Sequence, residues 1–190
     1  MCEKCGACIL WIGGNSKVIV NLIRHGYTQG NVEKRYIGIT DETLCDFGIE
    51  QLKSKEYPKC EYVYSSPMIR CIQTIKIIYP NTNFETIQDF KECNFGSFEN
   101  HNYLELCNNE DYQAWIDSNG TLPFPNGESR EEFSNRSYLA FKRVISKCEF
   151  NVISMVVHGG TIMSIMEHLR PNSNYFDFQI KNGEYITIKI

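Results

Sequence analysis

Two apolar segments that lead directly into histidines constrain the fold of this chain most. Residues 17–23 and 152–157 are continuous runs rich in Val and Ile, with the length expected of strands that are buried on both faces. Arg24 and His25 follow the first run at once, and His158 follows the second. Helix-like segments separate the apolar runs along the chain, which predicts strands that lie parallel to one another.

Strands that alternate with helices predict an α/β fold, a three-layer α/β/α sandwich with a mostly parallel central sheet and helices on both faces. Further strands are predicted at 61–64 and 84–87, and the alternating residues 185–190 predict an edge strand. The helix that follows the strand at 61–64 is expected to have Pro67 in its first turn, with Ser66 as its cap. In such sheets ligands bind outside the carboxyl ends of the strands.

The chain of 190 residues is long enough for one domain with a sizeable core, which we place at residues 17–190. Residues 1–16 then form an N-terminal extension that contains Cys2, Cys5 and Cys8. This spacing leaves a metal or cluster site open as an alternative. No fourth Cys or His ligand lies nearby, so a reactive extension without metal is favoured.

Charge and hydropathy argue against several classes of partner. The formal net charge is -4, with 19 basic and 23 acidic residues mixed along the chain, and no basic tract typical of nucleic-acid or anionic-membrane binders occurs. No apolar run reaches the roughly 20 residues that cross a bilayer, and the N-terminus lacks a signal-peptide pattern. We therefore expect a cytoplasmic protein without a nucleic-acid or membrane partner, and keep a homodimer as an alternative to the monomer.

Four basic side chains gather at the carboxyl ends of the predicted strands. Arg24 and His25 follow one strand, Arg70 lies at the start of the helix after another, and His158 follows a third. Each alone is explained by an ordinary buried ion pair, but together they suit attack on an anion. Guanidinium groups lower the pKa of a neighbouring imidazole below its usual value of about 6.5, which keeps the lone pair of His25 available.

Five short motifs in sequence order carry a family resemblance. They lie at residues 24–31 (Arg-His-Gly-x-Thr-x-x-Asn), 65–74, 92–99, 125–129 and 158–160 (His-Gly-Gly). With these motifs, the chain from about residue 17 onward resembles the histidine phosphatase superfamily, which includes the cofactor-dependent phosphoglycerate mutases. The order of the five motifs makes the resemblance specific, although each motif is short.

A phosphate monoester fits both the resemblance and the residues. Arg24 and Arg70 are expected to give forked donors to the phosphate oxygens, with His158 and the Asn31 amide completing the cradle. His25 is then the nucleophile that forms a phosphohistidine. Because the arginines supply the positive charge, neither a metal nor a cofactor is expected.

The acid that protonates the leaving alcohol is assigned to Glu92. It matches the acid position of the family and lies among aromatic residues, where partial burial raises the pKa of a carboxyl group. After the alcohol leaves, the Glu92 carboxylate can activate water. Glu99 lies in the same segment and remains the alternative, while Thr28 and Gly159 complete the predicted substrate-binding residues.

The expected function is a metal-independent phosphatase for small phosphomonoesters. Only a short connection joins Thr74 to Glu92, so we expect an open pocket. An open pocket favours a phosphatase over a mutase, because a mutase must exclude water. The compact length, Thr28 and the Pro-x-Gly-Glu-Ser loop at 125–129 look most like the α-ribazole phosphatases of cobalamin assembly. The alternatives are a phosphoglycerate mutase-type phosphotransferase and a non-catalytic phosphate-binding module on the same fold.

An aromatic segment is expected to flank this pocket. Residues 100–121 predict one or two short helices that pack as a lid or a flank. The rings of Tyr103, Tyr112, Trp115 and Phe124 could stack on a base or ring of the substrate, or could equally be core.

Overall fold

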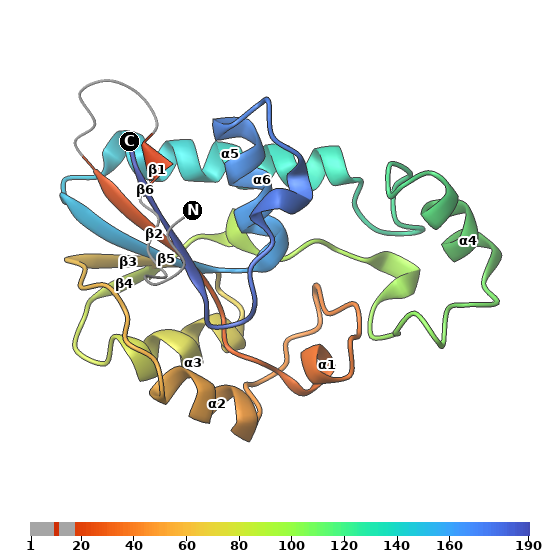
Figure 1. Ribbon diagram of the computed structural model, residues 1–190, viewed down its shortest axis with the longest axis horizontal. Helices are drawn as coiled ribbons and strands as arrows, with labels where there is room; N and C mark the ends of the chain where they lie inside the picture. Colours follow the sequence, from red (N-terminus) through yellow and green to blue (C-terminus); the bar gives the residue numbers. More distant parts are fainter. Residues whose placement is uncertain (1–9, 12–17) are drawn as a thin grey trace.

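The computed structural model describes the backbone of residues 10–11 and all of residues 18–190. Within this part of the chain, one sheet has the strand order β1-β6-β2-β5-β3-β4 (Figure 1). The strands are β1 (Leu10–Trp11), β2 (Ile19–Arg24), β3 (Tyr62–Ser65), β4 (Phe84–Thr86), β5 (Val152–Val157) and β6 (Tyr185–Lys189). Cys2, Cys5 and Cys8 lie outside the described residues, so their role stays a prediction.

The described strand pairs run parallel except for β2 with β6, which confirms the mostly parallel sheet. The prediction of an edge strand at 185–190 is wrong. β6 lies between β2 and β1, because Leu10–Trp11 pairs with Ile188 and Lys189. These two residues of β1 fall within the segment 1–16 that was predicted as an extension, so a part of that segment joins the sheet.

Helices cover both faces of the sheet, α5 and α6 on one side and α2 and α3 on the other (Figure 1). This arrangement confirms the three-layer α/β/α sandwich. The helices are α1 (Gln29–Val32), α2 (Asp46–Lys53), α3 (Ile69–Ile78), α4 (Glu110–Asp117), α5 (Arg130–Lys147) and α6 (Gly159–Leu169), with short 3-10 turns η1 (Gln88–Phe90), η2 (Gly96–Phe98) and η3 (Tyr175–Phe178). None of these described helices has the length and apolar composition of a membrane span.

Side chains of the central strand β5 alternate between the two helical layers. Ile153, Met155 and Val157 belong to the large apolar cluster under α5 and α6, whereas Val156 belongs to the smaller cluster under α3. All four side chains are fully buried. The strand is thus apolar on both faces, as the unbroken run of the sequence predicted.

Helix α3 begins later than the sequence indicated. Pro67 was expected in its first turn with Ser66 as the cap, but the helix starts at Ile69 after the N-cap Met68. The carboxylate of Asp41, from another loop, accepts the hydrogen bond of the Ile69 amide at 2.8 Å. A tertiary contact therefore satisfies this first-turn amide, and the Ser66 hydroxyl makes its contacts elsewhere.

The segment that carries α4 extends to one side of the sheet (Figure 1). It has a core of its own, in which Phe98, Tyr112 and Phe124 are buried and pack edge to face. Phe133 of α5 joins the same cluster and links it to the sandwich. The predicted lid segment is therefore anchored by aromatic packing and contains the helix α4.

The register of the parallel strands fixes where their carboxyl ends meet. Arg24 at the end of β2 pairs with Val157 at the end of β5, and Ser65 at the end of β3 pairs with Val156. Residues that follow these three strands consequently leave the sheet at the same edge. The candidate site lies there.

Candidate active site

The pairing of β2 with β5 brings the two predicted histidines together. The backbone amide of His25 extends the ladder by donating to the carbonyl of Val157, 3.0 Å away, and His158 follows Val157 directly. The two imidazole rings have their centroids 5.1 Å apart and an interplanar angle of 68°. Both side chains are buried, and the His25 ring lines a cavity.

The His25 ring is held in one tautomer by the residue that follows it. Its Nδ1 atom lies 2.7 Å from the carbonyl oxygen of Gly26, which can only accept a hydrogen bond. Nδ1 therefore carries the proton, and Nε2 carries the lone pair. In this tautomer Nε2 is the ring nitrogen available to a ligand as a nucleophile.

His158 lies behind His25 and does not line the cavity. Its Nδ1 accepts a hydrogen bond from Nε of Arg70 at 3.4 Å, and its Nε2 lies 2.8 Å from the hydroxyl of Ser66. Because a guanidinium only donates, Nε2 holds the proton and donates it to Ser66. Ser66 thus orients the second imidazole.

Arg24 reaches the cavity with an unsatisfied donor. Its Nη1 atom donates to the carbonyl of Ile180 at 2.7 Å, while its buried Nε has no hydrogen-bond partner among the described residues. Buried donors of this kind are normally paired, so the guanidinium is set up for an acceptor that enters the cavity. An anion supplies such an acceptor.

Arg70 occupies a different place from the one that the sequence predicted. It is fully buried, does not line the cavity, and donates to the carbonyls of Gly38 and Thr40, each at 2.8 Å. Its fork is occupied by backbone oxygens and is not open to a ligand in this conformation. The positive charge still acts on His25 and His158 from close by.

The two candidate acids occupy separate positions. Glu92 lines the cavity and accepts a hydrogen bond from the Cys93 amide at 3.0 Å. Glu99 accepts from the amides of Gly38 and Thr40, each at 2.8 Å, and does not line the cavity. Glu99 therefore fixes the loop that holds Arg70, and the geometry favours Glu92 as the acid.

Two glycines at the start of α6 allow these groups to approach closely. A Cβ on Gly159 would lie 3.2 Å from the guanidinium carbon of Arg24, and a Cβ on Gly160 would lie 2.6 Å from a carboxyl oxygen of Glu92. Both glycines line the cavity, which agrees with the predicted place of Gly159. The pair lets the N-terminus of α6 lie against the arginine and the acid, where the helix dipole favours an anion.

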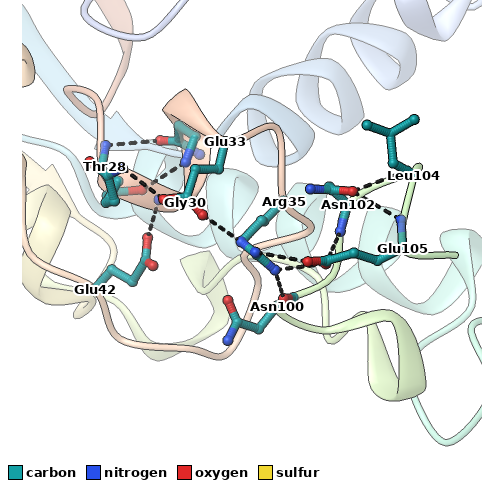
Figure 2. A network of polar contacts seen from close by, with 11 residues as sticks. Thr28, Gly30, Glu33, Arg35, Glu42, Asn100, Asn102, Leu104 and Glu105 are labelled. Carbon is teal, nitrogen blue, oxygen red and sulfur yellow. Dashed lines mark hydrogen bonds and ion pairs between the residues drawn. The ribbon is translucent and has the colours of Figure 1, made fainter.

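Asn31 and Thr28 were both predicted to bind substrate, and the structure separates them. Asn31 lines the cavity. Thr28 is fully buried and caps α1, with its hydroxyl accepting from the Asn31 amide and its own amide donating to Asn31 Oδ1, each at 3.3 Å (Figure 2). Thr28 therefore positions Asn31 and is not itself at the cavity wall.

Burial shifts the imidazoles and the acid in opposite directions. It lowers the pKa of His25 well below 6.5, and the charges of Arg70 and Arg24 lower it further. The same causes, burial first, lower the pKa of His158. At Glu92 burial raises the pKa above 4.5, and the arginine charges oppose this only in part. Neutral imidazoles and a carboxyl group that tends to hold its proton thus share one site.

The cavity has a volume of about 680 Å³ and is walled by aromatic rings on the side of α4. Of the predicted lid residues, Trp115 and Phe124 line it. Tyr112 is buried in the aromatic core and does not reach the cavity, and Tyr103 is exposed outside it. The aromatic segment therefore serves both as core and as cavity wall, depending on the residue.

Two arginines that line the cavity, Arg35 and Arg130, lie outside the sequence motifs, and both form ion pairs with carboxylates. Arg35 forms a two-pronged contact with Glu105, at 2.8 and 2.9 Å, and a further one with Glu33 at 2.7 Å (Figure 2). Arg130 donates to Glu167 at 2.6 Å. Each therefore has its charge balanced by carboxylates. No local motif marks them, because Glu105 and Glu167, which hold Arg35 and Arg130, lie far from them along the chain.

The described residues bring no three His, Cys, Asp or Glu side chains together in a group that could hold a metal ion. The groups able to bind an anion in the cavity are instead the guanidinium of Arg24, the amide of Asn31 and the first turn of α6.

Comparisons with known proteins identify the family and the fold. The family model for the histidine phosphatase superfamily (branch 1) matches residues 20–190. Phosphoglycerate mutase-like protein 4 of Arabidopsis thaliana is 29% identical, covering 89% of this chain and 82% of that protein. The adenosylcobalamin/alpha-ribazole phosphatase of Escherichia coli is 27% identical, covering 89% and 88%. The crystal structure of the alpha-ribazole phosphatase from Shigella flexneri superposes with a TM-score of 0.77 at 24% identity, covering 90% and 89%, and supports the fold.

We predict that His25 and His158 stay unprotonated through pH 6.5 in the folded protein, because burial and the arginine charges lower both pKa values below that figure. The unfolded chain takes up protons at these rings near pH 6.5, so the free energy of unfolding should fall as the pH drops below that value. NMR titration of the ring carbons, assigned with single-histidine variants, measures this directly, with the urea-unfolded chain as control. A midpoint at or above 6.5 for either folded ring would contradict it.

Proposed function

Because the chain belongs to the histidine phosphatase superfamily (branch 1), we propose that it is a metal-independent phosphatase that hydrolyses small phosphomonoesters through a phosphohistidine on His25. The observation that carries the proposal is the His25 ring, which Gly26 holds as the Nδ1–H tautomer at the wall of a cavity shared with Arg24 and Glu92. A nucleophile, a cation and an acid with a raised pKa are the groups that this reaction needs.

In the first step, the lone pair on Nε2 of His25 attacks the phosphorus atom of the bound monoester. The bond from phosphorus to the ester oxygen breaks, and that oxygen takes the proton of the Glu92 carboxyl group and leaves as the alcohol. The phosphoryl group is then bonded to Nε2, and Glu92 is a carboxylate. The lowered pKa of His25 keeps its lone pair free. The raised pKa of Glu92 favours the protonated carboxyl group that this step requires.

In the second step, a water molecule enters where the alcohol has left. The Glu92 carboxylate takes one proton from it as its oxygen attacks phosphorus, and the bond between phosphorus and Nε2 breaks. Inorganic phosphate leaves, His25 is again neutral, and Glu92 is again protonated. One carboxyl group thus acts as acid and then as base.

The phosphate would be held by donors of residues that line the cavity. Arg24 offers its unpaired Nε, Asn31 offers an amide, and Gly159 begins the helix α6 whose N-terminus favours an anion. Arg70 would contribute chiefly through its charge, since its fork is bound to the loop of Gly38 and Thr40. Phosphoryl transfer depends mainly on such positioning and charge stabilisation.

The cavity favours an uncharged alcohol that carries an aromatic ring over the phosphorylated sugar acid that a mutase binds. A phosphoglycerate carries a carboxylate that needs a cation of its own, but Arg35 and Arg130 are both already paired with carboxylates. Trp115 and Phe124 instead offer rings on which a base or aromatic ring can stack. We therefore propose a phosphomonoester whose alcohol carries an aromatic base, and α-ribazole 5'-phosphate is the candidate that the name of one relative, an alpha-ribazole phosphatase, suggests. A cytoplasmic location and the homodimer alternative stay predictions.

We predict that p-nitrophenyl phosphate is hydrolysed at an unchanged rate in excess chelator, because the charge on the phosphate is met by Arg24. His25→Ala should stay folded and lose turnover by on the order of a thousandfold or more, since the nucleophile is gone. His101→Ala, which removes an exposed histidine outside the cavity, is the control and should retain activity. Loss of activity in chelator, or normal turnover by His25→Ala, would refute the mechanism. Tight phosphate binding without cleavage of any monoester would favour the binding module.

We also predict that the loss of rate in Glu92→Gln depends on the leaving group of the substrate. Alkyl phosphates, whose alkoxides need a proton, should lose about 10² to 10⁴ in the rate of phosphoenzyme formation, while p-nitrophenyl phosphate should lose much less in that step. Glu99→Gln keeps an oxygen that can accept from the Gly38 loop and should show no such discrimination. Rapid-quench measurement of the phosphoenzyme makes the comparison. Discrimination by Glu99→Gln and none by Glu92→Gln would transfer the role to Glu99.

The third prediction concerns the aromatic wall. α-Ribazole 5'-phosphate and ribose 5-phosphate are both esters of the primary 5-hydroxyl of a ribose and differ in the base, so their ratio of kcat/KM isolates the contribution of the base. Stacking on Trp115 should favour the first by about ten to a hundredfold, and Trp115→Ala should reduce that ratio. Leu104→Ala changes an exposed side chain outside the cavity and should leave the ratio as it is. Equal kcat/KM for the two substrates would contradict the aromatic specificity.

A further inference from the structure

A short loop near the C-terminus packs against the backbone that carries the nucleophile. In residues 180–184, the carbonyl of Ile180 accepts from the Arg24 guanidinium at 2.7 Å. The amide of Gly183 lies 3.0 Å from the carbonyl of Arg24 and 3.1 Å from that of His25. Gly183 has φ of +70°, a conformation that glycine adopts without strain, and this turn brings the loop close to both residues.

Asn182, at the centre of this loop, places one amide among three oxygens. Its Nδ2 atom lies 3.1 Å from the carbonyl oxygen of His25, 3.3 Å from that of Gly26 and 3.0 Å from Oδ1 of Asn31. The side chain is buried. Since all three neighbours are acceptors, the amide can take only the orientation with its NH2 group toward them.

Two of these oxygens control groups that act on the phosphate. The Gly26 carbonyl is the one that accepts the Nδ1 proton of His25, so its position fixes the ring and its tautomer. Oδ1 of Asn31 accepts from Asn182 and from the Thr28 amide, which leaves the NH2 group of Asn31 for the cavity that this residue lines. Asn182 itself does not line the cavity.

We propose that Asn182 is a positioning residue, whose single buried amide sets the orientation of the nucleophile His25 and of the phosphate-facing amide of Asn31 together. The inference rests on the proposed phosphatase function and extends it to a residue outside the five motifs. A displacement of a nucleophile by about 1 Å can cost about a hundredfold in rate, so one amide that fixes two catalytic elements has a large effect.

The chain offers a matched control in Asn21. Its side chain is also buried, its Nδ2 lies 3.3 Å from Oγ of Ser154, and its Oδ1 accepts from Oγ1 of Thr187 at 2.8 Å. Asn21 belongs to β2, the strand that ends at Arg24, but it lies in the sheet and does not touch the nucleophile loop. Asn21→Ala therefore removes buried amide hydrogen bonds without disturbing His25.

The test compares Asn182→Ala and Asn182→Asp with Asn21→Ala in the full chain. We expect Asn182→Ala to lower kcat and the rate of phosphoenzyme formation by about ten to a hundredfold. Asn21→Ala should keep the kcat of the unchanged protein even if its unfolding temperature falls by as much as that of Asn182→Ala. If Asn182→Ala does not fold, Asn182→Asp, of the same shape but without the NH2 donors, gives the same comparison. Equal kcat for the Asn182 and Asn21 variants would overturn the proposal.

Two further readouts separate positioning from a general loss of stability. Because Asn182 acts in part through Asn31, the fold-loss in kcat of the double variant Asn31→Ala/Asn182→Ala should be smaller than the product of the fold-losses of the two single variants. The ring ¹⁵N spectrum of His25 should show one Nδ1–H tautomer in the unchanged protein and a mixture in Asn182→Ala. This spectrum needs no turnover, so it tests Asn182 even if no monoester is cleaved. Fully multiplicative losses together with an unaltered spectrum would refute the inference.

Discussion

The parallel pairing of β2 with β5 is the contact on which the site depends. It places Arg24 opposite Val157, and the residues that follow these two are the imidazoles of His25 and His158. A slip of one residue would turn every side chain of β2 to the other face of the sheet and move the two rings out of register. The buried hydrogen bonds of Asn21 in β2 to Ser154 of β5 and Thr187 of β6 are made in this register and would be lost in such a slip.

Burial then gives the site its chemistry. The same exclusion of water that lowers the pKa of the His25 imidazole raises the pKa of the Glu92 carboxyl group, so burial favours the neutral form of both at one cavity. The charges of Arg24 and Arg70 lower both pKa values. They therefore add to the effect of burial at His25 and oppose it at Glu92. A nucleophile and an acid with opposed shifts are the signature of acid-assisted displacement.

The sequence was sufficient for those parts of the fold and site that local pattern encodes. Apolar runs followed by His25 and His158 predicted the parallel sheet and the edge at which the two imidazoles meet, and the motif that contains Glu92 pointed to a carboxyl group that does line the cavity. The place of β6 depended on a partner, β1, that is only two residues long. A pattern of alternating residues cannot show whether such a partner exists.

Other parts of the site depend on contacts between distant segments, which residue spacing does not reveal. Arg70 was expected to face the phosphate, but the carbonyls of Gly38 and Thr40 occupy its fork. Arg35 and Asn182 likewise owe their places to loops that meet only in the folded chain.

The helix α4 lies beside the sandwich (Figure 1) and belongs to a separate aromatic core, whereas His25 and the glycines of α6 directly follow β2 and β5 of the sheet. In the proposed mechanism, the wall that would meet the alcohol and the floor that would meet the phosphate are therefore built from different stretches of chain. Exchange of the segment 100–128 during evolution could alter which esters fit while the reaction itself is preserved. An architecture divided in this way offers a physical route by which one chemistry diversifies across many metabolites.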